Sequence, residues 1–89
     1  MIRYKIDIID ALNRAGFNMY QAKKTGLLSQ GTYNKLKDND PGITLKSLNI
    51  ICSLLDLQPK DLIIYEETDA DIEAQDLFNN SKKDTKKDN

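Results

Sequence analysis

Residues 18–38, NMYQAKKTGLLSQGTYNKLKD, have the pattern of two short helices joined by a tight corner. Asn18 is a candidate N-cap for the first helix, because its side chain can accept a hydrogen bond from an amide that a first turn leaves unpaired. Tyr20–Lys24 would carry this helix. Gly26 follows, and glycine readily takes the positive φ that ends a helix sharply. The stretch is therefore predicted to begin as a capped helix that stops at a glycine.

The second helix of this stretch is predicted over Gln30–Lys37, with Ser29 as its N-cap. Tyr33 and Leu36 are three residues apart and share one face of this helix, and Leu28 leads into it. The remaining residues point elsewhere: Gln30, Gly31, Thr32, Asn34 and Lys35. A helix held down on one side, with Gln, Thr, Asn and Lys on the other, suits insertion into the major groove of DNA.

The polar side chains of this region are candidate DNA contacts. Gln and Asn can pair bidentately with adenine, Lys can donate to guanine, and Thr can touch a thymine methyl group. The predicted base-edge readers are Gln30, Thr32, Asn34 and Lys35. Phosphate contacts position a protein without specifying sequence, and the predicted ones are Asn18, Lys23, Lys24, Ser29, Lys37 and Lys46. The alternative interpretation is a solvated surface, since polar residues on small proteins are usually exposed to water.

Two segments of the chain, in this order, carry a family resemblance. The first comprises Ala22, Gly26, Leu28-Ser29, Thr32-Tyr33 and Lys35-Leu36. The second is ITLKSLNIICSLLDLQPKDLI, residues 43–63. Together they resemble the phage-repressor-like helix-turn-helix regulators, also called the Cro or xenobiotic-response-element (XRE) type, whose fourth helix closes with a Pro-x-Asp-Leu turn. The resemblance covers residues 1–65 and implies sequence-specific DNA binding, commonly repression by occupation of operator DNA.

Two more capped helices are predicted outside this stretch. Asp7 can cap one from Ile8 to Ala15, and Thr44 can cap another from Leu45 to Leu55. The apolar stripe of the second is Leu45, Leu48, Ile51, Cys52 and Leu55. Lys60–Leu62 can form one further turn, in which Asp61 accepts from nearby amides. Side chains assigned to the core by their spacing include Tyr20, Tyr33, Leu36, Leu48 and Cys52.

The two ends of residues 1–65 are predicted to meet in a small β element. Met1–Tyr4 alternates apolar and polar residues, and Ile63–Tyr65 is short, apolar and β-prone. The two segments are too far apart for a hairpin but can pair across the domain while leaning on the helices. The predicted fold class is mainly α: a lambda-repressor-like bundle of four to five short helices with a helix-turn-helix, plus this two-stranded element.

Charge divides the 89-residue chain into two parts. Residues 1–65 hold nine basic and six acidic residues, net +3, and are predicted to form the DNA-binding domain. Residues 66–89 hold four basic and eight acidic residues, net −4, and are predicted to be an acidic, then polar, partly disordered tail. Within it a short, weak helix is expected around Ile72, Ala74, Leu77 and Phe78, and disorder over residues 79–89. The tail confers solubility, folds on a protein partner, or competes with DNA for the basic face.

Composition argues against several classes of function. The chain has no histidine and a single cysteine, Cys52, which excludes an internal disulfide and disfavours a zinc site or a histidine-based catalytic pair. The carboxylates are scattered over caps and turns, so no enzyme, metal or cofactor is expected. No segment is long enough to span a membrane, and no signal peptide is evident. The expectation is a soluble cytoplasmic protein with no membrane partner and no small-molecule ligand.

The predicted function is sequence-specific binding of double-stranded DNA by a small transcriptional regulator, with repression inferred from the resemblance. One module of this size covers little DNA, so a homodimer on two half-sites is expected. The alternative is a protein-interaction module on the same scaffold, such as an antitoxin or a regulator's partner. Steep weakening of binding by salt would favour DNA, because phosphate contacts release counterions.

Overall fold

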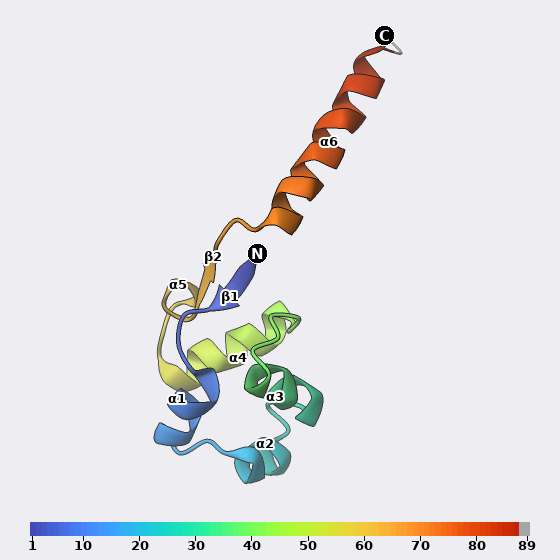
Figure 1. The fold of residues 1–89 in the computed structure, drawn as a ribbon. Helices are drawn as coiled ribbons and strands as arrows, with labels where there is room; N and C mark the ends of the chain where they lie inside the picture. The colour runs from blue at the N-terminus through green and yellow to red at the C-terminus, as the bar shows by residue number, and fades with distance from the viewer. Residues whose placement is uncertain (88–89) are drawn as a thin grey trace.

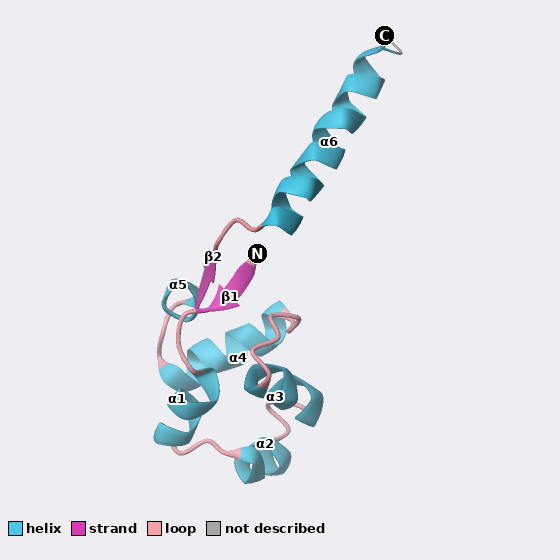
Figure 2. Ribbon diagram, in the orientation of Figure 1, coloured by secondary structure: helices cyan, strands magenta, loops and turns pink. Residues whose placement is uncertain are grey.

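The computed structural model describes the backbone of residues 1–87 and the side chains of residues 1–82. Its elements are, in chain order, β1 (Ile2–Tyr4), α1 (Ile8–Arg14), α2 (Met19–Thr25), α3 (Gln30–Lys37), α4 (Leu45–Leu55), α5 (Pro59–Leu62), β2 (Ile63–Tyr65) and α6 (Asp69–Lys87). Figures 1 and 2 show that the elements from β1 to β2 form a small domain from which α6 projects. The mainly helical fold with a two-stranded sheet confirms the predicted fold class.

Side-chain caps fix where the helices of the domain begin. The cap oxygens accept from the amide three residues on, as predicted: Asp7 from Asp10 at 3.0 Å, Asn18 from Gln21 at 3.0 Å, Ser29 from Thr32 at 3.1 Å and Thr44 from Ser47 at 3.0 Å. The predicted bounds of α3 and α4 are confirmed. Helix α2 is one residue longer at each end than predicted, and α1 ends at Arg14 with Ala15 as its C-cap.

The predicted pairing of the two ends of the domain is confirmed. Strands β1 and β2 pair antiparallel, with Arg3 opposite Ile64 at the centre of the register. Just beyond the ribbon, the amide of Lys5 donates to Leu62 O at 2.8 Å. A two-stranded ribbon is marginal alone, and this one leans on the helices through Ile63, which is half-buried against the core. The ribbon thereby holds the start of α1 and the end of α5 together.

The core lies between α1, α3, α4 and α5. Leu12, Ile51 and Leu62 are the largest side chains that are completely buried. The other buried residues are Ile8, Phe17, Ala22, Leu28, Tyr33, Leu36 and Leu48. No buried polar side chain is found among the described residues. Burial of apolar surface is therefore the main stabilising term of this small domain, at roughly 25 cal/mol for each Å².

Two apolar residues that were expected inside are outside. Tyr20, assigned to the core, is 65% exposed, and Leu45, assigned to the apolar stripe of α4, is 84% exposed. The buried residue of α2 is Ala22, and Tyr20 stands two positions away, which is about 200° around the helix. Leu45 is the first residue of α4 and extends past the core. Cys52 is half-buried and packs against the core, in place of the full burial expected.

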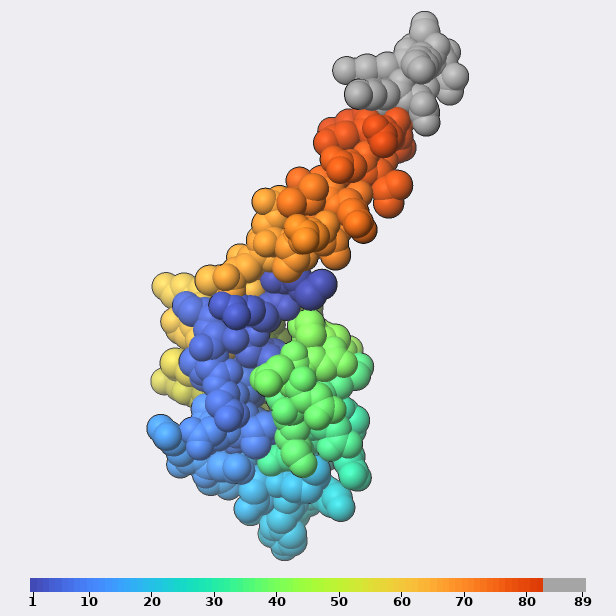
Figure 3. Space-filling model, in the orientation of Figure 1, coloured from blue at the N-terminus to red at the C-terminus, as the bar shows by residue number. Residues whose placement is uncertain are grey.

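Helix α6 differs from the short, weak helix and following disorder that the sequence predicted. It runs from Asp69 to Lys87. Figure 3 shows its coloured part extending away from the domain. Residues 79–87 are helical, whereas residues 88 and 89 lie outside the described part. Disorder was predicted because apolar residues become few in this segment. However, Ala, Glu, Gln, Leu and Lys favour a helix even where no side chain is buried. Acidic residues near the start and lysines near the end also suit the helix dipole.

The start of α6 is fixed by Asp71. Its carboxylate accepts from Thr68 N at 2.8 Å and Thr68 Oγ1 at 2.9 Å, and it also pairs with the amino group of Met1. Hydrogen bonds from the amino group and from Thr68 lower the pKa of Asp71 to about 2. Arg3 forms an ion pair with Glu66 in the segment between β2 and α6. These contacts attach α6 to the ribbon end of the domain.

Candidate nucleic-acid interface

The corner between α2 and α3 is fixed by hydrogen bonds. Gly26 has φ of +70°, and its N–H donates to Ala22 O at 2.9 Å. Thr25 Oγ1 donates to Gln21 O at 2.7 Å and accepts from Leu27 N at 3.2 Å. A side chain would be strained at this φ, so glycine ends α2 here. The predicted helix–corner–helix arrangement is confirmed.

One side of α3 is held firmly by the core. Tyr33 and Leu36 are 6% and 3% exposed, and Leu28, which leads into the helix, is 3% exposed. Ala22 of α2 belongs to the same cluster of buried residues. Because one face of α3 is fixed by packing, the direction in which its opposite face points is fixed as well.

The outer face of α3 carries Gln30, Gly31 and Asn34, all exposed. Gln30 and Asn34 are four residues apart and are therefore neighbours on the helix surface. Gly31 lies beside them, and a Cβ added there would meet only Ser29 Oγ, at 3.9 Å. This face is open, polar and unobstructed, with two amide side chains that can each offer a donor and an acceptor.

Thr32 and Lys35 do not join Gln30 and Asn34 on the open face. Thr32 is half-buried, and its Oγ1 accepts from Ser29 Oγ at 3.0 Å. Lys35 turns toward the following loop, where its Nζ donates to Gly42 O at 2.8 Å. The four residues predicted to read bases are thus split: Gln30 and Asn34 share the open face, whereas Thr32 and Lys35 lie beyond its edge and are engaged with Ser29 and Gly42.

The candidate phosphate contacts surround α3. Asn18 and Ser29 cap α2 and α3, so their side-chain oxygens already accept from backbone amides. Lys23 and Lys24 are in the last turn of α2, and Lys37 is in the last turn of α3. Lys46, in the first turn of α4, lines a shallow hollow with Gly26, Leu27, Ser29, Thr32, Ser47 and Ile50. Side chains from α3 and α4 and from the corner before α3 therefore meet at this hollow.

Tyr20 was predicted to lie in the core, but its side chain is exposed in this region. It stands in the first turn of α2, 65% exposed, with Lys24 Nζ 5.9 Å from the centre of its ring. A tyrosine hydroxyl and a lysine ammonium can both donate to a phosphate oxygen. The signal that could have placed it outside is Ala22, since a small residue two positions away occupies the buried face.

The acidic half of the tail lies away from this region. Figure 1 shows α6 leaving the domain at the ribbon end, whereas α2 and the corner are at the opposite end. The six acidic residues between Glu66 and Asp76 therefore do not cover α2 or α3 in this arrangement. The basic residues of the helix pair remain accessible.

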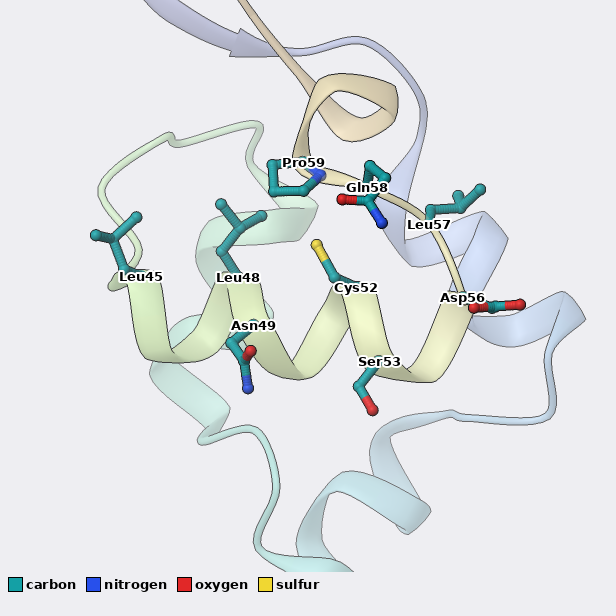
Figure 4. A pocket seen from close by; sticks show the side chains of 9 residues that line it. All are labelled: Leu45, Leu48, Asn49, Cys52, Ser53, Asp56, Leu57, Gln58 and Pro59. Atoms are coloured by element: carbon teal, nitrogen blue, oxygen red, sulfur yellow. The ribbon is translucent and has the colours of Figure 1, made fainter.

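A separate groove of about 480 Å³ runs along the other side of α4, where it meets α5. Figure 4 shows Leu48 and Cys52 pointing from α4 toward Pro59, with Leu45 at one end and Leu57 at the other. None of the predicted DNA contacts lines this groove. It is a second surface of the domain, half apolar, with a half-buried thiol in its wall.

Neither a metal site nor a membrane-spanning helix is found in the described part of the chain. Among the side chains that the structure describes, no three His, Cys, Asp or Glu residues are grouped so that they could hold a metal ion. In the same part of the chain, no helix is both long and apolar enough to cross a membrane.

A known protein family matches most of the chain. The model of the Cro/C1-type HTH DNA-binding domain matches residues 3–68, which includes every element from α1 to β2. No curated protein and no solved structure matches the chain. The match spans the corner, α3 and the ribbon together, so it covers the whole architecture that presents α3. The chain belongs to the Cro/C1-type helix-turn-helix family and carries a domain that binds double-stranded DNA.

Proposed function

We propose that this protein is a sequence-specific transcriptional regulator that represses by occupying operator DNA. The observation that carries the proposal is the open face of α3: Gln30 and Asn34 are exposed side by side on a helix whose other face is buried. A helix so held can enter the major groove with its polar side chains directed at base edges. Repression follows from occupancy, because a bound protein blocks other proteins from the same DNA.

Gln30 and Asn34 are proposed as the principal base readers. Each can accept from and donate to adenine, and a good bidentate contact is worth about 1–3 kcal/mol of discrimination. Thr32 is proposed to touch a thymine methyl group or a neighbouring phosphate. Lys35 can reach a guanine only if its ammonium leaves Gly42 O, to which it donates at 2.8 Å. Thr32 and Lys35 are thus proposed as contacts at the margins of the site.

The phosphate contacts are proposed to come from the helices next to α3. Lys23 and Lys24 are in the last turn of α2, and Lys46 is in the first turn of α4. The free amides at the starts of α2 and α3, next to the capping Asn18 and Ser29, can also meet a phosphate. Lys37, in the last turn of α3, completes the set. Such contacts set the register of α3 in the groove.

We further propose that the protein binds DNA as a homodimer. A single small module buries about 600–1,000 Å² of protein surface on DNA, which gives limited specificity. Two copies related by a two-fold axis read two half-sites and roughly double the number of base contacts. A palindromic operator is the corresponding expectation.

The alternative is a protein-interaction module, and one observation favours it. The groove along α4 is bordered by Leu45, which is 84% exposed, and this surface lies apart from α3. An apolar partner segment there would bury Leu45. Binding at this groove would depend little on salt, whereas DNA binding weakens steeply as salt rises.

Selection from a random duplex library at moderate salt tests the proposal. The wild type is compared with the triple variant Gln30→Ala, Asn34→Ala, Lys35→Ala. The matched control changes one exposed Gln, Asn and Lys elsewhere: Gln75→Ala, Asn13→Ala, Lys60→Ala. We expect a two-fold symmetric motif from the wild type and the control, and none from the α3 variant. A wild type that enriches no motif would contradict the proposal and turn the search to protein partners.

A further inference from the structure

Helix α6 carries an apolar stripe whose two large side chains are exposed to solvent. The stripe consists of Ala70, Ala74, Leu77, Phe78 and Ser81, which share one face at helical spacing. Leu77 is 73% exposed and Phe78 is 61% exposed. Ala74 and Ser81 are small, so a second helix can approach closely on either side of the two large residues. Two large side chains left in water on a helix that projects from its domain indicate a surface that packs against something else.

The charges along residues 66–89 identify the occupant. Residues 66–76 hold six acidic residues and no basic one, whereas residues 77–89 hold four lysines and two aspartates. One end of the segment is therefore strongly negative and the other is positive. The surface most complementary to such a segment is the same segment running in the opposite direction. A parallel copy would instead place acid beside acid along the first half.

The geometry of the helix agrees with an antiparallel copy. If Leu77 and Phe78 of one copy pack on Leu77 and Phe78 of the other, Ala74 comes opposite Ser81, since these two residues lie on either side of the centre. Asp71 and Lys82 are eleven residues apart, about three turns, and so lie on the same flank of the stripe. A two-fold axis through the centre brings Lys82 of one copy within two residues, about 3 Å along the helix axis, of the level of Asp71 of the other, twice. In the single chain, Lys82 Nζ lies 4.3 Å from the centre of the Phe78 ring, at the edge of the stripe.

We propose that α6 is a self-association helix: two copies of this chain pair antiparallel through Ala74, Leu77, Phe78 and Ser81. The interface is isologous, because the same patch of each copy meets itself. The proposal supplies the contact surface of the homodimer proposed above, and its test needs no DNA. With two large apolar side chains from each copy, the association is weak, with a dissociation constant of about 10 µM to 1 mM. The two domains lie at opposite ends of the helix pair, so the half-sites on DNA are widely spaced.

Sedimentation of the full chain over a range of concentration, at about 50 mM and about 500 mM salt, measures the association. We expect a monomer–dimer equilibrium at low salt whose dissociation constant rises several-fold at high salt, because the paired charges are screened. Leu77→Glu should raise the dissociation constant by more than about tenfold. The matched control is Asn79→Glu, which adds the same charge on the opposite face of α6 and should change it far less. Helical circular dichroism checks that both variants keep α6.

Crosslinking tests the direction of the pair. Cys52 is first replaced by serine, and two single-cysteine chains are made, Ala74→Cys and Ser81→Cys. On oxidation of a mixture of the two chains, an antiparallel pair gives mainly the disulfide between positions 74 and 81, whereas a parallel pair gives 74–74 and 81–81. Predominance of the mixed disulfide supports the proposal, and predominance of the like pairs overturns it.

Other outcomes also separate this inference from the proposed function. A wild type that remains monomeric up to about 1 mM at low salt overturns the inference, whether α6 is free or rests on its own domain. Equal effects of Leu77→Glu and Asn79→Glu would overturn it too. A chain that fails these tests but still selects a DNA motif retains the proposed function. A chain that passes them but selects no DNA supports the inference alone.

Discussion

Helices α3 and α6 begin in the same way but are held differently. Each starts at a residue with a hydroxyl cap, Ser29 or Thr68. In α3 the side chains of Tyr33 and Leu36 are buried, so the polar face has one fixed direction. In α6 all the described side chains except Asp71 are exposed. Capping and composition therefore decide whether a segment is helical, whereas tertiary packing decides what its faces are used for.

The largest expected effect is a difference in stability between substitutions in the core under α3 and substitutions in α6. Leu12→Ala removes a completely buried side chain from the core on which α3 rests, and should lower the free energy of unfolding by about 2–5 kcal/mol. Leu77→Ala in α6 removes a side chain of the same type that is 73% exposed, and should leave the unfolding of the domain within about 0.5 kcal/mol. Urea denaturation measures both. Similar losses from the two substitutions would contradict the division into a packed domain and a projecting helix.

The next effect concerns binding. Asn34→Ala should cost about 1–3 kcal/mol of specific affinity, roughly 5- to 150-fold, and leave the stability of the domain nearly unchanged because Asn34 is exposed. Asn79→Ala in α6, the matched change, should leave DNA affinity unchanged. Titration of each variant with a selected duplex gives the numbers. Equal losses from the two asparagines would show that α3 has no special role in binding.

Substitution of Gly31 is expected to have a smaller effect: it should raise the stability of the domain but weaken or alter DNA binding. Gly31→Ala should raise stability by about 0.5–1 kcal/mol, since alanine favours a helix and the added Cβ meets only Ser29 Oγ at 3.9 Å. If the outer face of α3 lies against base edges, the added methyl group should at the same time weaken or alter DNA binding. Thermal unfolding and a binding titration on one sample measure the two effects. If the variant is instead destabilised, the backbone conformation or the surroundings of Gly31 differ from those in the structure.

The smallest effect is the titration of Asp71 at the start of α6. Its pKa is lowered from 3.8 to about 2, chiefly by its hydrogen bond from the amino group of Met1. A carboxyl group with a depressed pKa stabilises the folded contact above its unfolded pKa of 3.8, and that contribution disappears as the pH falls through about 2. Attachment of α6 should therefore persist at pH 4 and be lost only near about pH 2. Side-chain NMR of Asp71 measures the midpoint, and a value near 3.8 would mean that the contact does not form.

Local signals explain what the sequence predicted well. The caps Asp7, Asn18, Ser29 and Thr44 each act on an amide three residues away, so a short stretch contains the whole cause. The bounds of α3 and α4 followed from these caps. The ribbon between the ends of the domain was predicted from two β-prone segments that the helices bring together.

The wrong predictions have causes that the pattern of apolar residues along the sequence does not show. Tyr20 is outside because it lies about 200° around α2 from the buried Ala22, and Leu45 is outside because α4 begins beyond the core. Lys35 leaves the open face of α3 because the carbonyl of Gly42 lies within its reach. The length of α6 was underestimated because apolar content was weighed above helix propensity. Which side chains contact DNA stays a prediction.

The measurement that tests the central claim most directly is the loss of a single base contact. The wild type and Asn34→Ala are titrated with the selected duplex and with a set of duplexes that each change one base pair of a half-site. If α3 reads the major groove, Asn34→Ala will lose discrimination at one base pair and keep the wild-type ranking at the others. If instead the variant ranks every duplex as the wild type does, Asn34 does not face the bases, and the proposed reading through α3 is wrong.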